Sequence, residues 1–362
     1  MPRNDKLPMN ESHLSRLKVL ELASVLAGPA VGTFLAELGA EVIKIENPNS
    51  GGDVTRSWKL TSENPDSPIS AYFSSVNYGK EHLFLDFKNP DDLAKVQKLA
   101  SESDIVIANF RGGQASRFDL DFESIKKKNP KVIYGNITGF SVESSRPAYD
   151  VVLQAETGYM FMNGQPDSDA TKMPVALIDV LAAHQMKEAI LLALFNRGRN
   201  GAGSFVEVSL FDAAVSALTN QASNWLMNYH VPQRIGSLHP NIAPYGEILE
   251  TKDGKQIVLA IGSNAHFEGL CSVLGLETLI VDARFVSNQE RVKNRSVLHD
   301  MLQEKARIQD SSILMEQFLN KNIPVGVIRN LEEVFEEEAA QNLIRQEDGT
   351  KRVSQIAFKI SS

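Results

Sequence analysis

The strongest constraint on the fold is the alternation of short apolar runs with amphipathic segments in the first two thirds of the chain. Residues 17–22 (LKVLEL) predict a buried strand, Pro29 suits the first turn of a helix to about Leu38, and residues 40–46 (AEVIKIE) predict a second strand. Further strands are expected at 82–87, 104–110, 131–136 and 205–209, with helices at 90–100, 122–128, 179–197 and 211–227. This order predicts an α/β fold, an open and mostly parallel Rossmann-like sheet with helices on both faces.

The pattern changes after Tyr229, where prolines crowd a polar stretch. Residues 247–261 predict two strands joined at Lys252-Asp253-Gly254, and helices are expected at 265–274, 290–305 and 311–319. We therefore expect a large domain over 1–225, a smaller α+β domain over 236–325, and a return segment to the large domain over 326–362.

Composition limits the cellular location and the binding partners that we expect for this chain. The formal net charge is −8, which does not favour nonspecific binding to nucleic acid or to anionic membranes. The first 18 residues are polar, and the longest apolar stretch, residues 23–36, is too short to span a membrane. The single cysteine, Cys271, excludes an internal disulfide and fits a reducing compartment. These features together predict a cytoplasmic protein.

The sequence lacks the motifs of several common cofactor-binding and catalytic sites. The first strand–helix turn has no G-x-G-x-x-G, and Pro29 stands where a backbone N–H would face a phosphate, so a dinucleotide site is not expected. There is no zinc-like His/Cys spacing, no G-x-S-x-G elbow and no Walker A loop. We expect no metal and no permanently bound cofactor.

Seven motifs in the same order resemble those of the class III CoA-transferases, the CaiB/BaiF or formyl-CoA transferase family. They are SVLAGP with LGAEVIKIE at 24–46, GDVTR at 52–56, NYGK with LD at 77–86, NF with Arg117 at 109–117, RPAYD with QA and Gly158 at 146–158, HP with PY at 239–245, and Arg291 with NR and IPVG at 291–326. Each motif alone is weak, but together they span most of the chain. The resemblance implies a two-domain chain and an interlocked homodimer.

The resemblance also implies an enzyme that moves coenzyme A between an acyl-CoA donor and a carboxylic acid acceptor through an aspartyl anhydride and an aspartyl-CoA thioester. The family's nucleophile aligns with Asp179, which follows a short apolar run. A carboxylate at a helix start accepts N–H groups and is kept ionised by the helix dipole, so Asp179 also fits a plain N-cap. Both roles remain open at this point.

Other site residues follow from the same resemblance. The positions matched to CoA binding are Val25, Leu26, Lys88, Asn109, Phe110 and Arg117, and those matched to the substrate are Tyr72, Tyr149 and His239. Lys88 and Arg117 could pair with phosphates or stay solvated, Phe110 could stack or only pack, and the tyrosines and His239 could be structural. Leu26 replaces a substrate-contacting Gln of the formyl-CoA branch, which argues against oxalate-like acids.

Two alternatives differ in chemistry. An α-methylacyl-CoA racemase on this scaffold needs an Asp/His pair of bases, and this chain has Tyr149-Asp150 where that branch has His-Asp. A non-catalytic CoA-binding protein would need Asp179 to point away from the thiol end of CoA. The substrates expected here are an acyl-CoA and a carboxylic acid, and CoA is a carried group.

Overall fold

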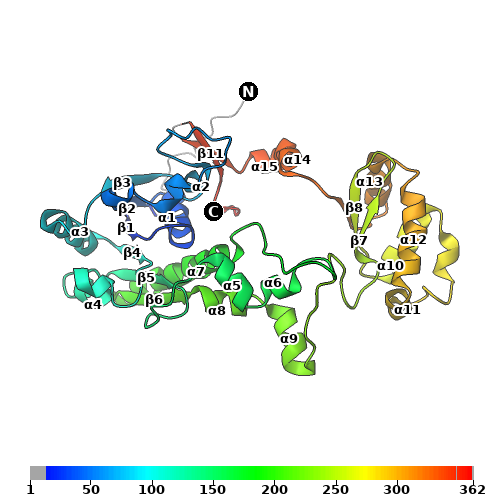
Figure 1. Ribbon diagram of the computed structural model, residues 1–362, viewed down its shortest axis with the longest axis horizontal. Coiled ribbons are helices and arrows are strands. Elements are labelled where there is room, and N and C mark those ends of the chain that lie inside the picture. The colour runs from blue at the N-terminus through cyan, green and yellow to red at the C-terminus, as the bar shows by residue number, and fades with distance from the viewer. Residues whose placement is uncertain (1–13, 348, 361–362) are drawn as a thin grey trace. The chain divides into compact units, whose positions relative to one another are not determined.

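The computed structural model describes residues 14–347 and 349–360 (Figure 1). Contacts divide the chain into two compact units. Of the described residues, the first unit comprises 14–159, 172–230, 342–347 and 349–360, and the second comprises 160–171 and 231–341. The segment 326–341 therefore belongs with the second unit, whereas we expected it to return to the first.

The first unit is built on a six-stranded parallel sheet in the order β3-β2-β1-β4-β5-β6. The strands are β1 (Lys18–Leu22), β2 (Glu41–Glu46), β3 (Lys80–Phe84), β4 (Ile105–Ala108), β5 (Ile133–Thr138) and β6 (Ser204–Ser209). Every neighbouring pair runs parallel, as in β1 and β4, where Leu20 aligns with Val106. The predicted open Rossmann-like sheet is confirmed, and its order reverses between β1 and β4, where doubly wound sheets bind ligands.

Helices lie between these strands and after the last of them. They are α1 (Ala27–Glu37), α2 (Ala71–Ser74), α3 (Pro90–Glu102), α4 (Phe122–Lys126), α5 (Asp150–Glu156), α6 (Tyr159–Met162), α7 (Leu177–Asn200), α8 (Leu210–Ser216) and α9 (Thr219–Asn228), of which α6 extends into the second unit. Asn89 caps α3 as predicted, with its side chain accepting from Asp91 N and Asp92 N. The single helix predicted over 211–227 is wrong: Ala217 and Leu218 separate α8 from α9, and Thr219, the first residue of α9, has φ of 42°.

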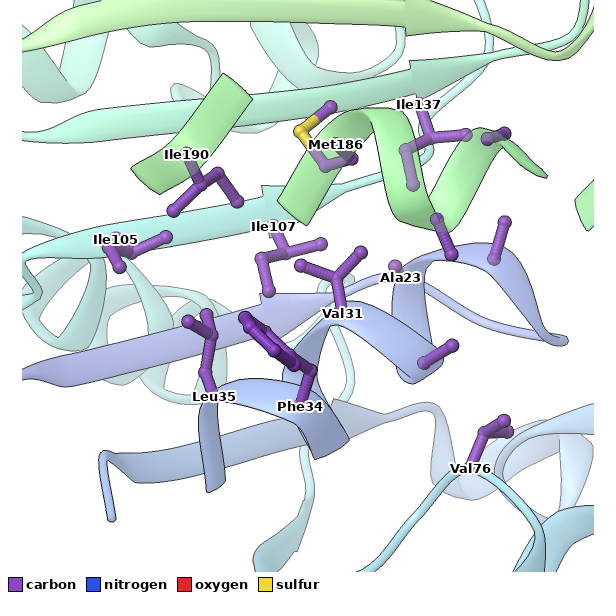
Figure 2. Close-up of a cluster of buried hydrophobic side chains, with 14 of the residues drawn as sticks. Ala23, Val31, Phe34, Leu35, Val76, Ile105, Ile107, Ile137, Met186 and Ile190 are labelled. Carbon is purple, nitrogen blue, oxygen red and sulfur yellow. The ribbon is translucent and has the colours of Figure 1, made fainter. Parts of the chain in front are cut away.

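Both faces of the sheet are buried. On one face, α1 and α7 pack against β4 and β5, and Figure 2 shows Val31 and Phe34 of α1 beside Ile107 and Met186. On the other face, Val96 of α3 packs with the side chains that alternate along the same strands. Side chains of successive strand residues point to opposite faces, which explains why β4 and β5 are buried along their whole length. The packing of α7 against the sheet fixes the position of its first turn.

The second unit has a three-stranded antiparallel sheet in the order β7-β8-β9. Its strands and helices are β7 (Tyr245–Glu250), β8 (Gln256–Ala260), α10 (Asn264–Leu274), α11 (Asn288–Lys293), α12 (Arg295–Ala306), α13 (Ser311–Asn320), β9 (Val325–Val327), α14 (Leu331–Glu336) and α15 (Glu338–Gln341). The β7–β8 hairpin confirms the turn at 252–254, and Cys271 is buried in the core of this unit. The hairpin of β10 (Ile344–Glu347) and β11 (Thr350–Val353) belongs to the first unit.

No helix in the described residues is long and apolar enough to cross a membrane.

Candidate active site

A cleft lies in the first unit at the reversal of strand order, where the loops after β1 and β4 meet. Its empty volume is about 870 Å³, part of it open to solvent. The lining residues are Ser24, Val25, Leu26, Ala27, Asn109, Phe110, Arg111, Ile137, Thr138, Gly139, Ser144, Arg146, Ala148, Tyr149, Asp179 and Leu210. They come from the carboxyl ends of β1, β4 and β5 and from the start of α7, the place where this topology binds ligands.

Asp179 is the third residue of α7 and reaches this cleft with only 8% of its surface exposed. The expectation that it caps the helix is wrong, because α7 begins at Leu177 and has no side-chain cap from its own N-cap residue. The capping group is Asp150, whose Oδ1 accepts from Ile178 N at 2.7 Å and from Asp179 N at 3.4 Å. The helix N–H groups therefore bind Asp150 rather than the Asp179 carboxylate.

The electrostatics of Asp179 also differ from the expectation. Burial, followed by the negative charge of Asp150, raises the pKa of Asp179 to about 7, whereas we expected the helix N-terminus to keep this group fully ionised. A buried carboxylate beside another carboxylate is costly to ionise, and such perturbed groups cluster at functional sites.

Asn109 ties the two strand-end loops together. Its Oδ1 accepts from Ser24 N at 3.2 Å, and its Nδ2 donates to Ser24 O at 3.0 Å. The side chain thus holds the loop after β1 against the loop after β4, while the residue also lines the cleft. Phe110, next in sequence, lines the cleft and packs against Phe87 with ring centroids 6.3 Å apart.

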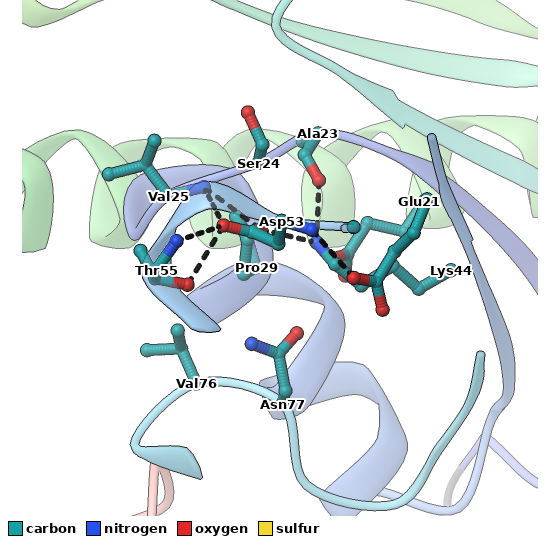
Figure 3. Close-up of polar contacts among 12 residues, drawn as sticks. Glu21, Ala23, Ser24, Val25, Pro29, Lys44, Asp53, Thr55, Val76 and Asn77 are labelled. Atoms are coloured by element: carbon teal, nitrogen blue, oxygen red, sulfur yellow. Dashed lines mark hydrogen bonds and ion pairs between the residues drawn. The ribbon is translucent and has the colours of Figure 1, made fainter. Parts of the chain in front are cut away.

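The loop after β1 has an unusual conformation at Val25. This β-branched residue has φ of 75°, a region that non-glycine residues rarely adopt. Its N–H is held by the carboxylate of Asp53, at 3.1 Å from Oδ2 and 3.4 Å from Oδ1 (Figure 3). Asp53 caps the short 3-10 helix Val54–Ser57 and is 5% exposed.

The other predicted site residues fall in different places. Leu26 and Tyr149 line the cleft, and Tyr149 is half exposed. Tyr72 is not among the lining residues, but burial and then the charges of Asp179, Asp150 and Asp53 raise its pKa to about 12, so its hydroxyl lies within electrostatic reach of Asp179.

Besides Tyr72, three predicted residues lie outside the cleft lining. Lys88 and Arg117 are exposed on the first unit outside the lining set. His239 belongs to the second unit, where its ring packs edge-on against Tyr245 at 5.3 Å and its Nδ1 accepts from Asn241 N.

With this geometry in place, similarity to known proteins identifies the family. The sequence matches CoA-transferase family III over residues 14–361. The chain belongs to this family. It is 35% identical to a succinate–glutarate CoA-transferase of Agrobacterium fabrum over 95% of this chain and 88% of that protein. It is 32% identical to an acetyl-CoA:oxalate CoA-transferase of Acetobacter aceti over 92% of this chain and 85% of that protein.

A solved structure supports the same assignment. The crystal structure of a CaiB/BaiF family protein from Brucella suis superposes with a TM-score of 0.85, at 36% identity, over 96% of this chain and 93% of that one. The family resemblance drawn from the seven motifs is confirmed, and the chain is an enzyme of the class III CoA-transferase type.

Sequence reasoning missed four polar residues at or beside the cleft. Arg111 and Arg146 line it, and Arg146 forms an ion pair with Glu156 and stacks over Phe140 at 4.4 Å. Asp53 and Asp150 stood inside quoted motifs without a role. The Asp53 carboxylate accepts the N–H of Val25, and the Asp150 carboxylate accepts the N–H of Ile178, each 28 positions away in sequence. No local sequence pattern predicts such contacts.

Among the residues that the structure describes, no group of three or more His, Cys, Asp or Glu side chains is arranged to hold a metal ion.

Proposed function

We propose that this enzyme transfers coenzyme A from an acyl-CoA donor to a free carboxylic acid, with Asp179 as the group that carries CoA between them. One observation carries the proposal. Of the described residues that line the cleft, Asp179 is the one carboxylate, and it lies where the sheet order reverses. A carboxylate is the enzyme nucleophile that this exchange needs, because it forms the same anhydride and thioester bonds as the substrates.

The proposed reaction proceeds in balanced steps. An oxygen of the Asp179 carboxylate attacks the carbonyl of the donor thioester, the C–S bond breaks, and a mixed anhydride and CoA thiolate result. The thiolate attacks the Asp179 carbonyl of that anhydride and releases the donor acid as a carboxylate, leaving an aspartyl-CoA thioester. The acceptor carboxylate then repeats these steps in reverse, which regenerates Asp179 and gives the new acyl-CoA.

The raised pKa of Asp179 suits this role. With a pKa of about 7, the ionised form that attacks the thioester is populated at neutral pH. A carboxylate of higher pKa is also a stronger base and a stronger nucleophile than an ordinary one. The burial that raises the pKa also limits the access of water, which would otherwise hydrolyse the anhydride.

For CoA we propose binding along the loops after β1 and β4. Val25 and Leu26 would contact the pantetheine end of CoA, and Phe110 would contact either the adenine or the pantetheine chain. Arg111 would bind the phosphates, since a guanidinium binds phosphate oxygens by charge-assisted hydrogen bonds. Asn109 would act through Ser24. A second hollow of about 570 Å³ shares Ser24 with the cleft and offers room for the nucleotide part. Lys88 and Arg117, both exposed, remain candidates for the outer phosphates.

For the acids we propose dicarboxylates longer than oxalate. The relatives named for succinate and glutarate support a dicarboxylate. Leu26 lines the cleft and offers no polar group to a short diacid, while Arg146 offers a cation for a second carboxylate. Tyr149 and Tyr72 would contact the acyl group through their hydroxyls, and His239 stays a candidate from the second unit.

We also propose a cytoplasmic homodimer whose two chains interlock. The single chain leaves large apolar side chains exposed on α7 and α9, among them Phe195 at 61% and Met227 at 78%. Exposed apolar side chains of this size are common at protein–protein interfaces.

The test is a screen of acyl-CoA donors against a panel of mono- and dicarboxylic acids, with products identified by mass spectrometry. We expect exchange with a dicarboxylate pair, and loss of exchange with retained CoA binding in Asp179→Asn. Asp66→Asn, a matched change at an exposed carboxylate, should behave as wild type. Hydroxylamine added with an acyl-CoA should convert Asp179 to a hydroxamate and inactivate the enzyme.

The two alternatives give different results in the same experiment. A racemase would incorporate deuterium at the α-carbon of a 2-methylacyl-CoA in D₂O without needing an acceptor acid. A CoA-binding protein without activity would bind CoA but show no exchange and no labelling of Asp179. Either result would overturn the transferase proposal.

A further inference from the structure

Buried charged side chains hold the segment Ala23–Pro29 from the protein interior. This segment, called the cleft loop below, comprises the loop after β1 and the first three residues of α1. Lys44 Nζ donates to Ala23 O at 2.7 Å, and Lys80 Nζ donates to Pro29 O at 2.8 Å. Glu21 pairs with both lysines, at 2.8 Å from Lys44 and 2.7 Å from Lys80. Each of these side chains is at most 1% exposed, so both ends of the loop are fixed from the interior.

Asp53 supplies the contact to the middle of this loop. Its carboxylate accepts the Val25 N–H, pairs with Lys44 Nζ at 3.1 Å, and accepts from Thr55 N at 3.1 Å and Thr55 Oγ1 at 2.8 Å. Its own N–H donates to Glu46 Oε2 at 2.7 Å, and Glu46 in turn binds Arg56 through both carboxylate oxygens. Asp53 is therefore held by several polar contacts at once, as Figure 3 shows for those with Val25, Thr55 and the Lys44 amine.

Val25, whose N–H is held by Asp53, has a strained backbone conformation. A valine at φ of 75° does not keep that conformation without compensating contacts, because its Cβ and branched side chain clash with the backbone there. In most proteins glycine occupies such positions. Strain of this kind persists only where the surroundings over-determine it, and it concentrates at functional sites.

The strained residue controls the geometry of the cleft. Ser24, Val25, Leu26 and Ala27 all line it, and Ala27 begins α1, whose N-cap Leu26 has no side chain able to cap the first turn. If Val25 relaxed to a negative φ, the carbonyl and N–H groups around it would change direction. The start of α1 would then present a different surface to the bound thioester.

We propose that Asp53 is a positioning residue for CoA and its thioester: it holds Val25 in the left-handed conformation and so fixes the wall of the cleft that the loop after β1 forms. This proposal rests on the proposed function, since it assigns Asp53 a role in that cleft. It also gives a physical reason for the aspartate of the GDVTR motif, which lies outside the cleft lining and lines the second hollow. A direct contact of Asp53 with CoA in that hollow would act equally in both backgrounds of the test below.

The test is a double-mutant cycle of Asp53→Asn and Val25→Gly, read by calorimetric CoA affinity and by kcat and KM for transfer. In Asp53→Asn the neutral amide cannot form an ion pair with Lys44 and holds Val25 less firmly, so we expect kcat/KM and CoA affinity to fall by about tenfold or more. Glycine adopts positive φ without strain. In the Val25→Gly background the same change at Asp53 should therefore cost less than about threefold.

Several controls keep the outcomes distinct. Because Val25 itself lines the cleft, the double variant is compared with the Val25→Gly single variant and not with the wild type. Asp66→Asn controls for the loss of a negative charge. Thermal unfolding shows whether each variant is folded. If Asp53→Asn does not fold, Thr55→Val removes one hydrogen bond to Asp53, and the same dependence on Val25→Gly is expected, at smaller amplitude.

Equal effects of Asp53→Asn in both backgrounds, or no effect in either, would overturn the positioning role while leaving the transferase intact. Failure of the wild-type protein to bind CoA or to transfer it would instead overturn the proposed function, and the positioning role with it.

Discussion

Asp150 Oδ1 accepts the backbone N–H of Asp179 at 3.4 Å, so two carboxylates meet at the first turn of α7. The same oxygen accepts from Ile178 N, and Asp150 Oδ2 accepts from Gln154 Nε2 at 2.6 Å. Asp150 thus accepts the helix N–H groups and remains outside the cleft lining, while Asp179 lines the cleft and has a raised pKa. This division of roles gives the structure its first testable consequence.

If Asp179 acts as an ionised nucleophile, kcat/KM will rise with pH through a midpoint near 7, the pKa given by burial and by Asp150. Asp150→Asn removes the neighbouring negative charge, and its amide oxygen can still accept the helix N–H groups. We expect the midpoint to fall by about one pH unit, since a like charge disfavours ionisation by roughly that amount or more. The measurement is the pH profile of kcat/KM between about pH 5 and 9.

A matched control for that profile is Asp119→Asn. Asp119 is exposed and has φ of 51°, a conformation that asparagine tolerates. Its profile should superpose on that of the wild type. An unchanged midpoint in Asp150→Asn would show that Asp150 does not set the ionisation of the reacting group.

Asp179 should also lower the stability of the folded protein at neutral pH. Its folded pKa of about 7 exceeds the ordinary value of 3.8, so the folded state binds this proton more tightly than the unfolded chain. Stability is therefore lost as pH rises from about 4 to about 7. Asp179→Asn removes the cost, and we expect a gain on the order of 4 kcal/mol at about pH 8.

Urea unfolding at two pH values checks this prediction. At about pH 4, where the wild-type group is largely protonated in the folded protein, the substitution should change the free energy of unfolding little. A variant less stable than wild type at the higher pH would contradict the raised pKa. A more stable but inactive variant is the signature expected of a functional residue kept at a cost to stability.

The sequence predicted the sheet because the relevant information is local. Each parallel strand contains apolar residues within a short run, and Gly39 and Asn89 mark a helix end and a helix start between strands. The site was only partly predictable. Asp179 and Asn109 came from the family resemblance, but their contacts depend on residues far away in sequence, such as Asp150 and Ser24. Periodicity and capping rules act over a few residues and cannot reveal them.

The break between α8 and α9 illustrates the same limit. No glycine or proline marks Ala217 or Leu218, and Thr219 has φ of 42° without any local signal for it. The error in the ionisation of Asp179 arose differently. The helix dipole was correctly expected at this position, but a second acid occupies the N–H groups, and burial then dominates the pKa.

Gly32 lies where α1 crosses the buried charges. A Cβ there would lie 1.9 Å from Glu21 Oε2 and 3.2 Å from Lys80 Cε, so Gly32→Ala must displace the ion pairs that hold the cleft loop. We expect a loss of about 1–3 kcal/mol in the free energy of unfolding, as for overpacked cores. CoA affinity should fall with it. Gly198→Ala in α7, where a Cβ meets nothing within 4 Å, is the control and should stabilise slightly.

The interlocked homodimer predicts a specific hydrodynamic behaviour. Light scattering after size exclusion should give about twice the chain mass of 39.9 kDa, and dilution should not split the species, because threaded chains separate only by unfolding. Phe195→Glu places a charge on the exposed apolar face of α7 and should lower that mass or cause aggregation. Val281→Glu, at a position 83% exposed on the second unit, is the matched control and should keep the wild-type mass. A concentration-independent mass of one chain for the wild type would refute the dimer, while leaving Asp179 and its cleft within a single chain unaffected.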